Sequence, residues 1–140
     1  MNGIRSASLL LVLTILSACS SKSSADEVTK ELQSVKSWAA TAHLVGDSWI
    51  RKDVPTAYAK QTLSKAQQEL QKEQDNLSQK APPQSRAMFI AQVQHLQATV
   101  AHMSEAVEEK NSQAMSQELQ QLSAQEQSVS TLAKTAGVQP

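Results

Sequence analysis

Residues that interrupt helices are few in this chain, and their spacing divides most of it into segments of similar length. Prolines stand at positions 55, 82, 83 and 140, and Gly46 is the only glycine between residues 4 and 136. Asn111 followed by Ser112 adds a polar break with a candidate helix N-cap. The segments between these breaks hold about 25 to 28 residues, so as helices each would be roughly 40 Å long. We therefore expect four helices of matched length.

Each segment also carries inward-facing positions in alternating steps of three and four residues. This repeat of 3.5 residues lets helices pack nearly parallel, with the side chains of one between those of the next. The four predicted seams are Val28, Leu32, Val35, Ala39, Ala42, Gly46 and Trp49; Ala59, Leu63, Ala66, Leu70, Glu73 and Leu77; Phe89, Val93, Leu96, Val100, Met103 and Val107; and Met115, Leu119, Leu122, Glu126, Val129, Ala133 and Ala136. The second seam is the most polar.

Local signals place the helix ends. Ser24 and Glu27 form a capping-box pattern, so the first helix is expected to begin near Ser24. Pro55 suits the first position of the second helix, and the third is expected to open at Pro83. The fourth follows Asn111, with Gly137 as its C-cap.

Composition agrees with this reading. The chain is rich in Ala, Gln, Leu, Ser, Lys and Glu, has four aromatic residues and shows no sustained period-two alternation. The predicted fold class is all-α, an antiparallel up-down-up-down four-helix bundle. The alternative is two long hairpins that complete their cores in a homodimer, because the second seam is so polar. A weak echo between "WIRKDVPTAYAKQTL" and "VEEKNSQAMSQEL" hints at a duplicated hairpin.

The N-terminal residues indicate export. Arg5 is the only charge before Lys22, and it precedes a mostly apolar run from Ala7 to Leu16 that is too short to span a bilayer as a helix. The run ends in Leu16-Ser17-Ala18-Cys19, which resembles the lipobox of bacterial lipoproteins. That resemblance implies a diacylglycerol on the sulfur of Cys19, cleavage just before this residue and an N-acyl lipid on the new amine.

These features predict three parts: a signal peptide over 1–18, a lipidated Cys19 with a flexible serine-rich tether over 19–24, and a helical domain over 25–140. The lipid anchor makes the membrane a partner of the protein. Ser20, in place of the aspartate that retains such lipoproteins in the inner membrane, implies the periplasmic face of the outer membrane in a two-membrane host. The domain that would remain after cleavage, a Gln- and Ala-rich helical bundle, also resembles the mature part of several helical envelope lipoproteins.

Charge and motifs narrow the function. Loss of Arg5 with the signal leaves 12 basic residues against 13 acidic ones, so the sequence predicts no nucleic-acid partner. It has no Gly-rich phosphate loop, and no histidine follows a glutamate by three residues as in di-iron bundles. We therefore expect no catalytic residues and no cofactor besides the lipid. The expected role is structural or protein-interacting, with a partner in the envelope.

One end of the predicted bundle gathers residues that could bind a ligand or a partner: His43, Trp49, Tyr58, Met103 and Met115. The glycine at position 46 could leave space beside them. This end would lie away from the membrane and could hold a small hydrophobic ligand, haem or a soft metal ion. The alternative interpretation is a packed end of the core, with methionines filling gaps.

Other polar residues have plainer explanations. His95 and His102 lie opposite the third seam, about 10 Å apart along the helix, and are expected on a solvated face. Glu73 and Glu126 occupy seam positions, where a buried carboxylate is costly unless paired. They could be acids of a catalytic site, but a half-exposed boundary position or a slight helix rotation explains both more simply.

Overall fold

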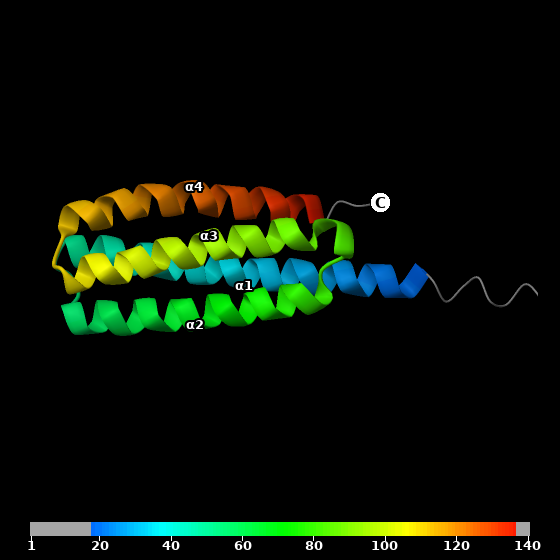
Figure 1. The fold of residues 1–140 in the computed structure, drawn as a ribbon, viewed down its shortest axis with the longest axis horizontal. Coiled ribbons are helices and arrows are strands. Elements are labelled where there is room, and N and C mark those ends of the chain that lie inside the picture. Colours follow the sequence, from blue (N-terminus) through cyan, green and yellow to red (C-terminus); the bar gives the residue numbers. More distant parts are fainter. Residues whose placement is uncertain (1–17, 137–140) are drawn as a thin grey trace, which may run out of the picture.

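The computed structural model describes residues 18–136, with side chains described from residue 24 onward. Four helices account for nearly all of it: α1 (Ala18–Ile50), α2 (Thr56–Lys80), α3 (Pro83–Glu108) and α4 (Ser112–Ala136). They run antiparallel in sequence order, as Figure 1 shows. Each helix packs against its two neighbours around the bundle, α4 against α1 included, while the diagonal pair α1 and α3 touches only slightly. The predicted up-down-up-down bundle is confirmed.

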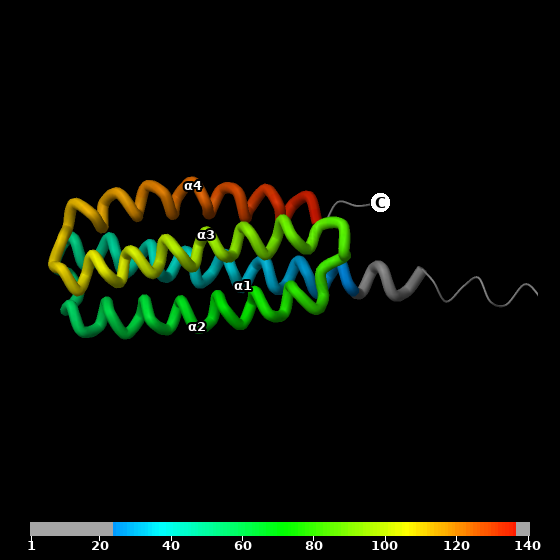
Figure 2. The backbone as a smooth tube through the Cα atoms, viewed as in Figure 1, coloured from blue at the N-terminus to red at the C-terminus, as the bar shows by residue number. Residues whose placement is uncertain are grey.

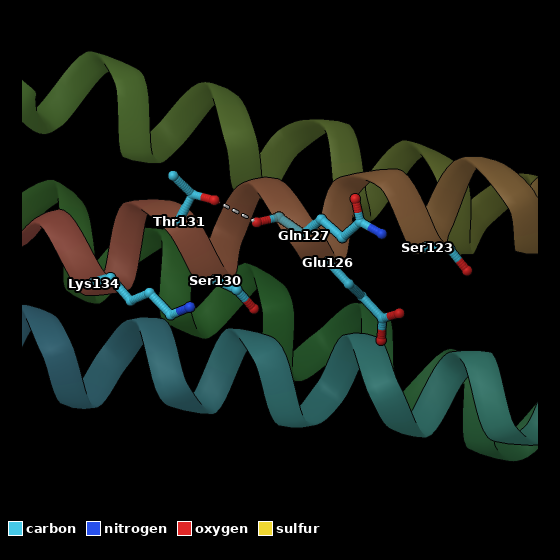
Figure 3. Close-up of a pocket in the computed structure, with 6 residues that line it drawn as sticks. All are labelled: Ser123, Glu126, Gln127, Ser130, Thr131 and Lys134. Carbon is cyan, nitrogen blue, oxygen red and sulfur yellow. Dashed lines mark hydrogen bonds between the residues drawn. The ribbon is translucent and has the colours of Figure 1, made fainter.

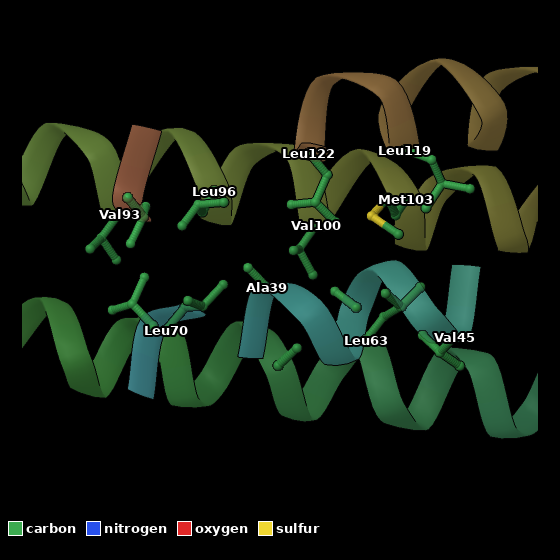
Figure 4. Close-up of a cluster of buried hydrophobic side chains, with 14 of the residues drawn as sticks. Ala39, Val45, Leu63, Leu70, Val93, Leu96, Val100, Met103, Leu119 and Leu122 are labelled. Atoms are coloured by element: carbon green, nitrogen blue, oxygen red, sulfur yellow. The ribbon is translucent and has the colours of Figure 1, made fainter. Parts of the chain in front are cut away.

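The core follows the predicted seams closely. Every predicted seam residue of α1, α2 and α3 is buried. In α4, Met115, Leu119, Leu122 and Val129 are buried, whereas Glu126 and the alanines near the end are half-buried. Leucine, valine and methionine side chains from all four helices interlock along the axis, and Figure 4 shows part of this layer. Burial of apolar surface at about 25 cal/mol per Å² makes this seam the main source of stability.

The helix boundaries differ from the prediction at two places. The first helix begins at Ala18, so the expected start near Ser24 is wrong, and residues expected to form a flexible tether are helical. No proline or glycine interrupts the chain between residue 18 and Gly46, so nothing in the backbone forces a later start. The second helix takes Pro55 as its N-cap, one residue before its first helical position. The predicted signal peptide and Gly137 lie outside the described residues, apart from Ala18.

The third and fourth helices begin as expected. Pro83 occupies the first turn of α3, where its missing N–H removes no helical hydrogen bond. Asn111 caps α4, because its side-chain oxygen accepts a hydrogen bond of 3.0 Å from the backbone N–H of Ala114. That bond satisfies one of the N–H groups that the first turn of a helix leaves free.

Helices α1 and α3 end in the same way, at the turns that lead to α2 and α4. Lys52 and Lys110 both have positive φ, 64° and 54°. In the first turn the N–H of Asp53 donates to the Ser48 carbonyl, and in the second the N–H of Asn111 donates to the Ala106 carbonyl, at 2.9 and 2.8 Å. Both are Schellman motifs built on a lysine in place of the usual glycine. The sequence echo between these stretches thus corresponds to one repeated turn geometry.

Both turns lie at one end of the bundle (Figure 2). The opposite end holds the α2–α3 turn and the C-terminal end of α4, and the N-terminal part of α1 extends past it (Figure 1). Since α3 has 26 residues, the two ends are about 39 Å apart at 1.5 Å per residue. Among the described residues, none of the helices combines the length and the apolar character needed to cross a bilayer.

Candidate functional site

The end with the two Schellman turns brings together only part of the predicted ligand-binding set. Met103 and Met115 are fully buried and meet at Gly46. A Cβ built on that glycine would lie 2.7 Å from Met103 Cε, 3.0 Å from Met115 Sδ and 3.1 Å from Leu119 Cδ2. The space that the glycine leaves is therefore filled by these three side chains. In this structure the methionines pack as core residues.

The other members of that set, two aromatic residues and a histidine, have different partners or lie at the surface. Trp49 is buried, and its indole N–H donates to Thr56 Oγ1 at 3.2 Å, which fixes the start of α2 against the end of α1. Tyr58 is 53 % exposed. His43 faces α4 and pairs with Glu126, with 3.1 Å between Nδ1 and Oε2. The set does not converge on one cavity.

Figure 3 shows a surface hollow along α4. Six residues that line it all belong to that helix: Ser123, Glu126, Gln127, Ser130, Thr131 and Lys134. Glu126 and Lys134 reach from it toward α1. The hollow is polar and open to solvent, and with a wall from one helix it offers little enclosing surface to a small ligand.

The predicted solvated face of α3 is confirmed. His95 and His102 are exposed, and the nearest carboxylate to His102 is Glu118 of α4, at 3.7 Å. Glu126, half-buried and paired with His43, matches the expected boundary position. The same expectation for Glu73 is wrong, because its side chain is only 5 % exposed.

Glu73 belongs to a polar cluster between α1 and α2 that we call the carboxyl cluster: Glu31, Ser34, Glu73, Asn76 and Lys80. Its two carboxyl groups are buried, whereas the Lys80 side chain is 37 % exposed. Ser34 Oγ donates to Glu73 Oε1 at 2.7 Å. Asn76 Nδ2 donates to Glu31 Oε2 at 3.0 Å and, more weakly, to Glu73 Oε2 at 3.4 Å. Lys80 Nζ lies 2.6 Å from Glu31 Oε1. Two carboxyl groups from neighbouring helices thus share an amide donor.

The two carboxyl groups have opposite electrostatic surroundings. A hydrogen bond with the Glu73 carboxyl, helped by donors from Lys80 and Asn76, lowers the pKa of Glu31 to about 2 although burial opposes it. Burial, and next the hydrogen bond with Glu31, raises the pKa of Glu73 above 4.5. Paired carboxyl groups often divide in this way, since both cannot be charged at close range without a large cost.

Sequence reasoning found Glu73 but missed the rest of the carboxyl cluster. Glu31 precedes Leu32 of the seam and stands seven residues before Trp38 and fourteen before Val45. Trp38 is half-buried against the core and Val45 is buried, so these three residues form a second inward stripe on α1 that faces α2. This seven-residue spacing is the feature of the sequence that could have predicted the burial of Glu31.

Thr99 of α3 is another buried polar residue outside the predicted set. It is fully buried, and its hydroxyl has no hydrogen-bond partner among the described residues. Also within those residues, no three His, Cys, Asp or Glu side chains come together in a way that could hold a metal ion. Comparison with protein-family models, curated proteins and solved structures finds no significant match to this chain.

Proposed function

We propose that this protein is a lipid-anchored envelope lipoprotein whose helical bundle acts as a structural or protein-interaction module without catalysis. The lipobox-like residues Leu16 to Cys19 give the anchor. Several acyl chains on one residue, at about 0.8 kcal/mol per buried CH₂, hold a protein firmly at a bilayer. In a two-membrane host, Ser20 favours the periplasmic face of the outer membrane, as in similar lipoproteins.

The observation that carries the proposal is the direction of the bundle. The end of α1 nearest Cys19 lies at the end opposite the turns α1–α2 and α3–α4 (Figure 1). With the anchor at the bilayer, those two turns lie at the far end of α1, whose 33 residues span about 50 Å along the axis. An elongated bundle held at one end is suited to contact a partner with the other.

The distal surface has the chemistry of a polar protein contact. Arg51 lies 2.9 Å from both Asp47 and Asp53, and these side chains are about half exposed. Tyr58 lies in the first turn of α2, just after the α1–α2 turn, and is more than half exposed. Arginine and tyrosine are enriched in protein interfaces because they offer a broad contact surface together with hydrogen-bond donors. We assign the partner-binding surface to this end.

The anchor is tested with Cys19→Ser in the full chain, expressed in its own host. The parent protein is expected in the membrane fraction, with an intact mass that includes acyl chains. The variant is expected to keep its signal uncleaved or to leave the membrane fraction unlipidated. A native product with an unmodified sulfur at Cys19 would refute the anchored role.

The partner surface is tested with a photo-crosslinking amino acid at either end of the anchored protein. A probe at Lys52 in the distal turn should capture an envelope protein. A probe at Ser85, next to the α2–α3 turn, is the matched control and should capture less. Crosslinks only from the Ser85 probe would contradict the assignment of the partner surface to the distal end.

No observation favours the haem, small-ligand or soft-metal carrier, which stays a prediction.

A further inference from the structure

The carboxyl cluster contains one more negative group than it has cations. Glu31 and Glu73 are 7 % and 5 % exposed, and the cation that contacts the pair is the ammonium of Lys80. This ammonium lies 2.6 Å from Glu31. The hydrogen bonds to Glu73 come from neutral groups, the hydroxyl of Ser34 and the amide of Asn76. If both carboxyl groups were charged, one buried charge would have no cation of its own.

A buried charge without a counterion is costly, and a carboxyl group avoids the cost by binding a proton. Glu31 has the ammonium, so the proton belongs on Glu73. A protonated Glu73 can donate to the Glu31 carboxylate while its other oxygen still accepts from Ser34, so that both carboxyl groups have hydrogen-bond partners. Loss of that proton would place two negative groups face to face across the α1–α2 interface.

We propose that the packing of α2 on α1 depends on a proton: Glu73 binds it at this interface, and the bound proton strengthens the contact between the two helices. The inference is independent of the lipid anchor, because the carboxyl cluster lies entirely within the bundle. It concerns the half of α1 and α2 that lies toward the α2–α3 turn.

Among the residues with described side chains, no other charged group pairs with Glu73. On α1, Glu27 adds a further negative charge that acts on Lys80. On α3, the other helix packed against α2, Arg86 is engaged with the Ala81 carbonyl at 2.8 and 3.1 Å. On α4, which packs against α1 but not against α2, Glu126 pairs with His43 and Lys134 lies in the surface hollow.

The sign of the pH effect follows from Glu73. Its pKa in the folded protein is raised above 4.5, so the folded state holds the proton more tightly than the unfolded chain. The resulting stability is fully present below about 4.5 and is lost as the pH rises through the folded pKa. Glu31 acts in the other direction, with stability lost only as the pH falls from 4.5 toward 2. Stability from the cluster should therefore be greatest at mildly acidic pH.

The test compares the parent chain with Glu73→Gln, which keeps the shape of the protonated carboxyl group but cannot titrate. Both full-length proteins are purified in detergent, and Tm is measured by circular dichroism between about pH 4.5 and 7.5. The difference in Tm, variant minus parent, should increase as the pH rises across this range. Taking the difference cancels the pH dependence of all other groups that the two proteins share.

Glu69→Gln is the matched control. Glu69 lies on the same helix and is ion-paired with Lys65 at 2.7 Å, and this partner lowers its pKa. Its variant should therefore follow the parent with a constant offset in Tm above pH 4.5. A constant offset for Glu73→Gln as well would overturn the proposal.

A second measurement does not depend on the variant folding well. The side-chain carboxyl carbon of Glu73 in the parent protein is followed by NMR as the pH is changed. A midpoint above 4.5 for Glu73, together with a midpoint well below 4.5 for Glu31, is expected. A midpoint for Glu73 at or below 4.5 would overturn the proposal even if the variant profiles differed.

Discussion

Replacement of Gly46 by alanine tests how tightly the core is packed where α1, α3 and α4 meet. The new methyl group would lie 2.7 Å from Met103 Cε, whereas carbon atoms in contact are normally 3.5–4.0 Å apart. Met115 Sδ and Leu119 Cδ2, at 3.0 and 3.1 Å, close the other directions. One or more of these buried side chains must move by close to 1 Å.

Two effects of opposite sign decide the magnitude. Alanine is favoured over glycine inside a helix by about 1 kcal/mol. Forcing an extra methyl group into a filled core costs about 1–3 kcal/mol. We expect the packing term to exceed the helix term, so that Gly46→Ala lowers the free energy of unfolding by about 1 kcal/mol. Met103 is flexible but fully buried, so its movement displaces other core atoms.

Denaturation in urea, followed by circular dichroism at 222 nm, measures this free energy in the parent, Gly46→Ala, Met103→Ala and the double variant. Truncating Met103 removes the shortest of the three contacts beside residue 46, so in that background Gly46→Ala should be less destabilising than in the parent. Leu44→Ala is the control on the same helix, because its side chain is 66 % exposed, and its effect should be within about 0.5 kcal/mol. Stabilisation of the parent by Gly46→Ala, or no dependence on Met103, would refute the packing argument.

Two further predictions concern a turn and the carboxyl cluster. Lys110→Gly should raise the free energy of unfolding by about 0.5–1 kcal/mol, because glycine adopts the positive φ of 54° without steric cost. Lys52→Gly should have the same effect. A lower urea midpoint in both variants would contradict the turn assignment. Lys80→Met should raise the pKa of Glu31 from about 2 toward its usual range. The Tm of the variant should therefore fall less than that of the parent between pH 4.5 and 2. An equal fall in Tm would show that Lys80 does not hold this carboxylate charged.

The helix starts illustrate what local sequence can and cannot predict. The breaks at Pro55, Pro83 and Asn111 are local, since a missing N–H or a capping side chain acts within one helical turn, and the structure places all three at helix starts. The start of α1 was misplaced because the capping-box pattern at Ser24 is a preference and not a barrier. A helix continues through such a residue when its neighbours also favour helix.

The two seam glutamates show where the pattern is ambiguous. Glu73 and Glu126 both occupy predicted seam positions, yet the first is buried and the second half-buried. The difference comes from their partners on α1, since Ser34 and Glu31 face Glu73, and His43 faces Glu126 near the surface. Partners 39 and 83 residues away in the chain cannot be read from a heptad repeat.

The amino-acid sequence by itself determined the number of helices, the seams they bury and the order in which they run, because these follow from backbone chemistry and from apolar periodicity within each segment. Only the tertiary structure decided that Gly46 makes room for two methionines, that Tyr58 stays at the surface, and that Glu31 meets Glu73. Each of those outcomes depends on how one helix is rotated and shifted against another. That arrangement is set by packing all four helices together.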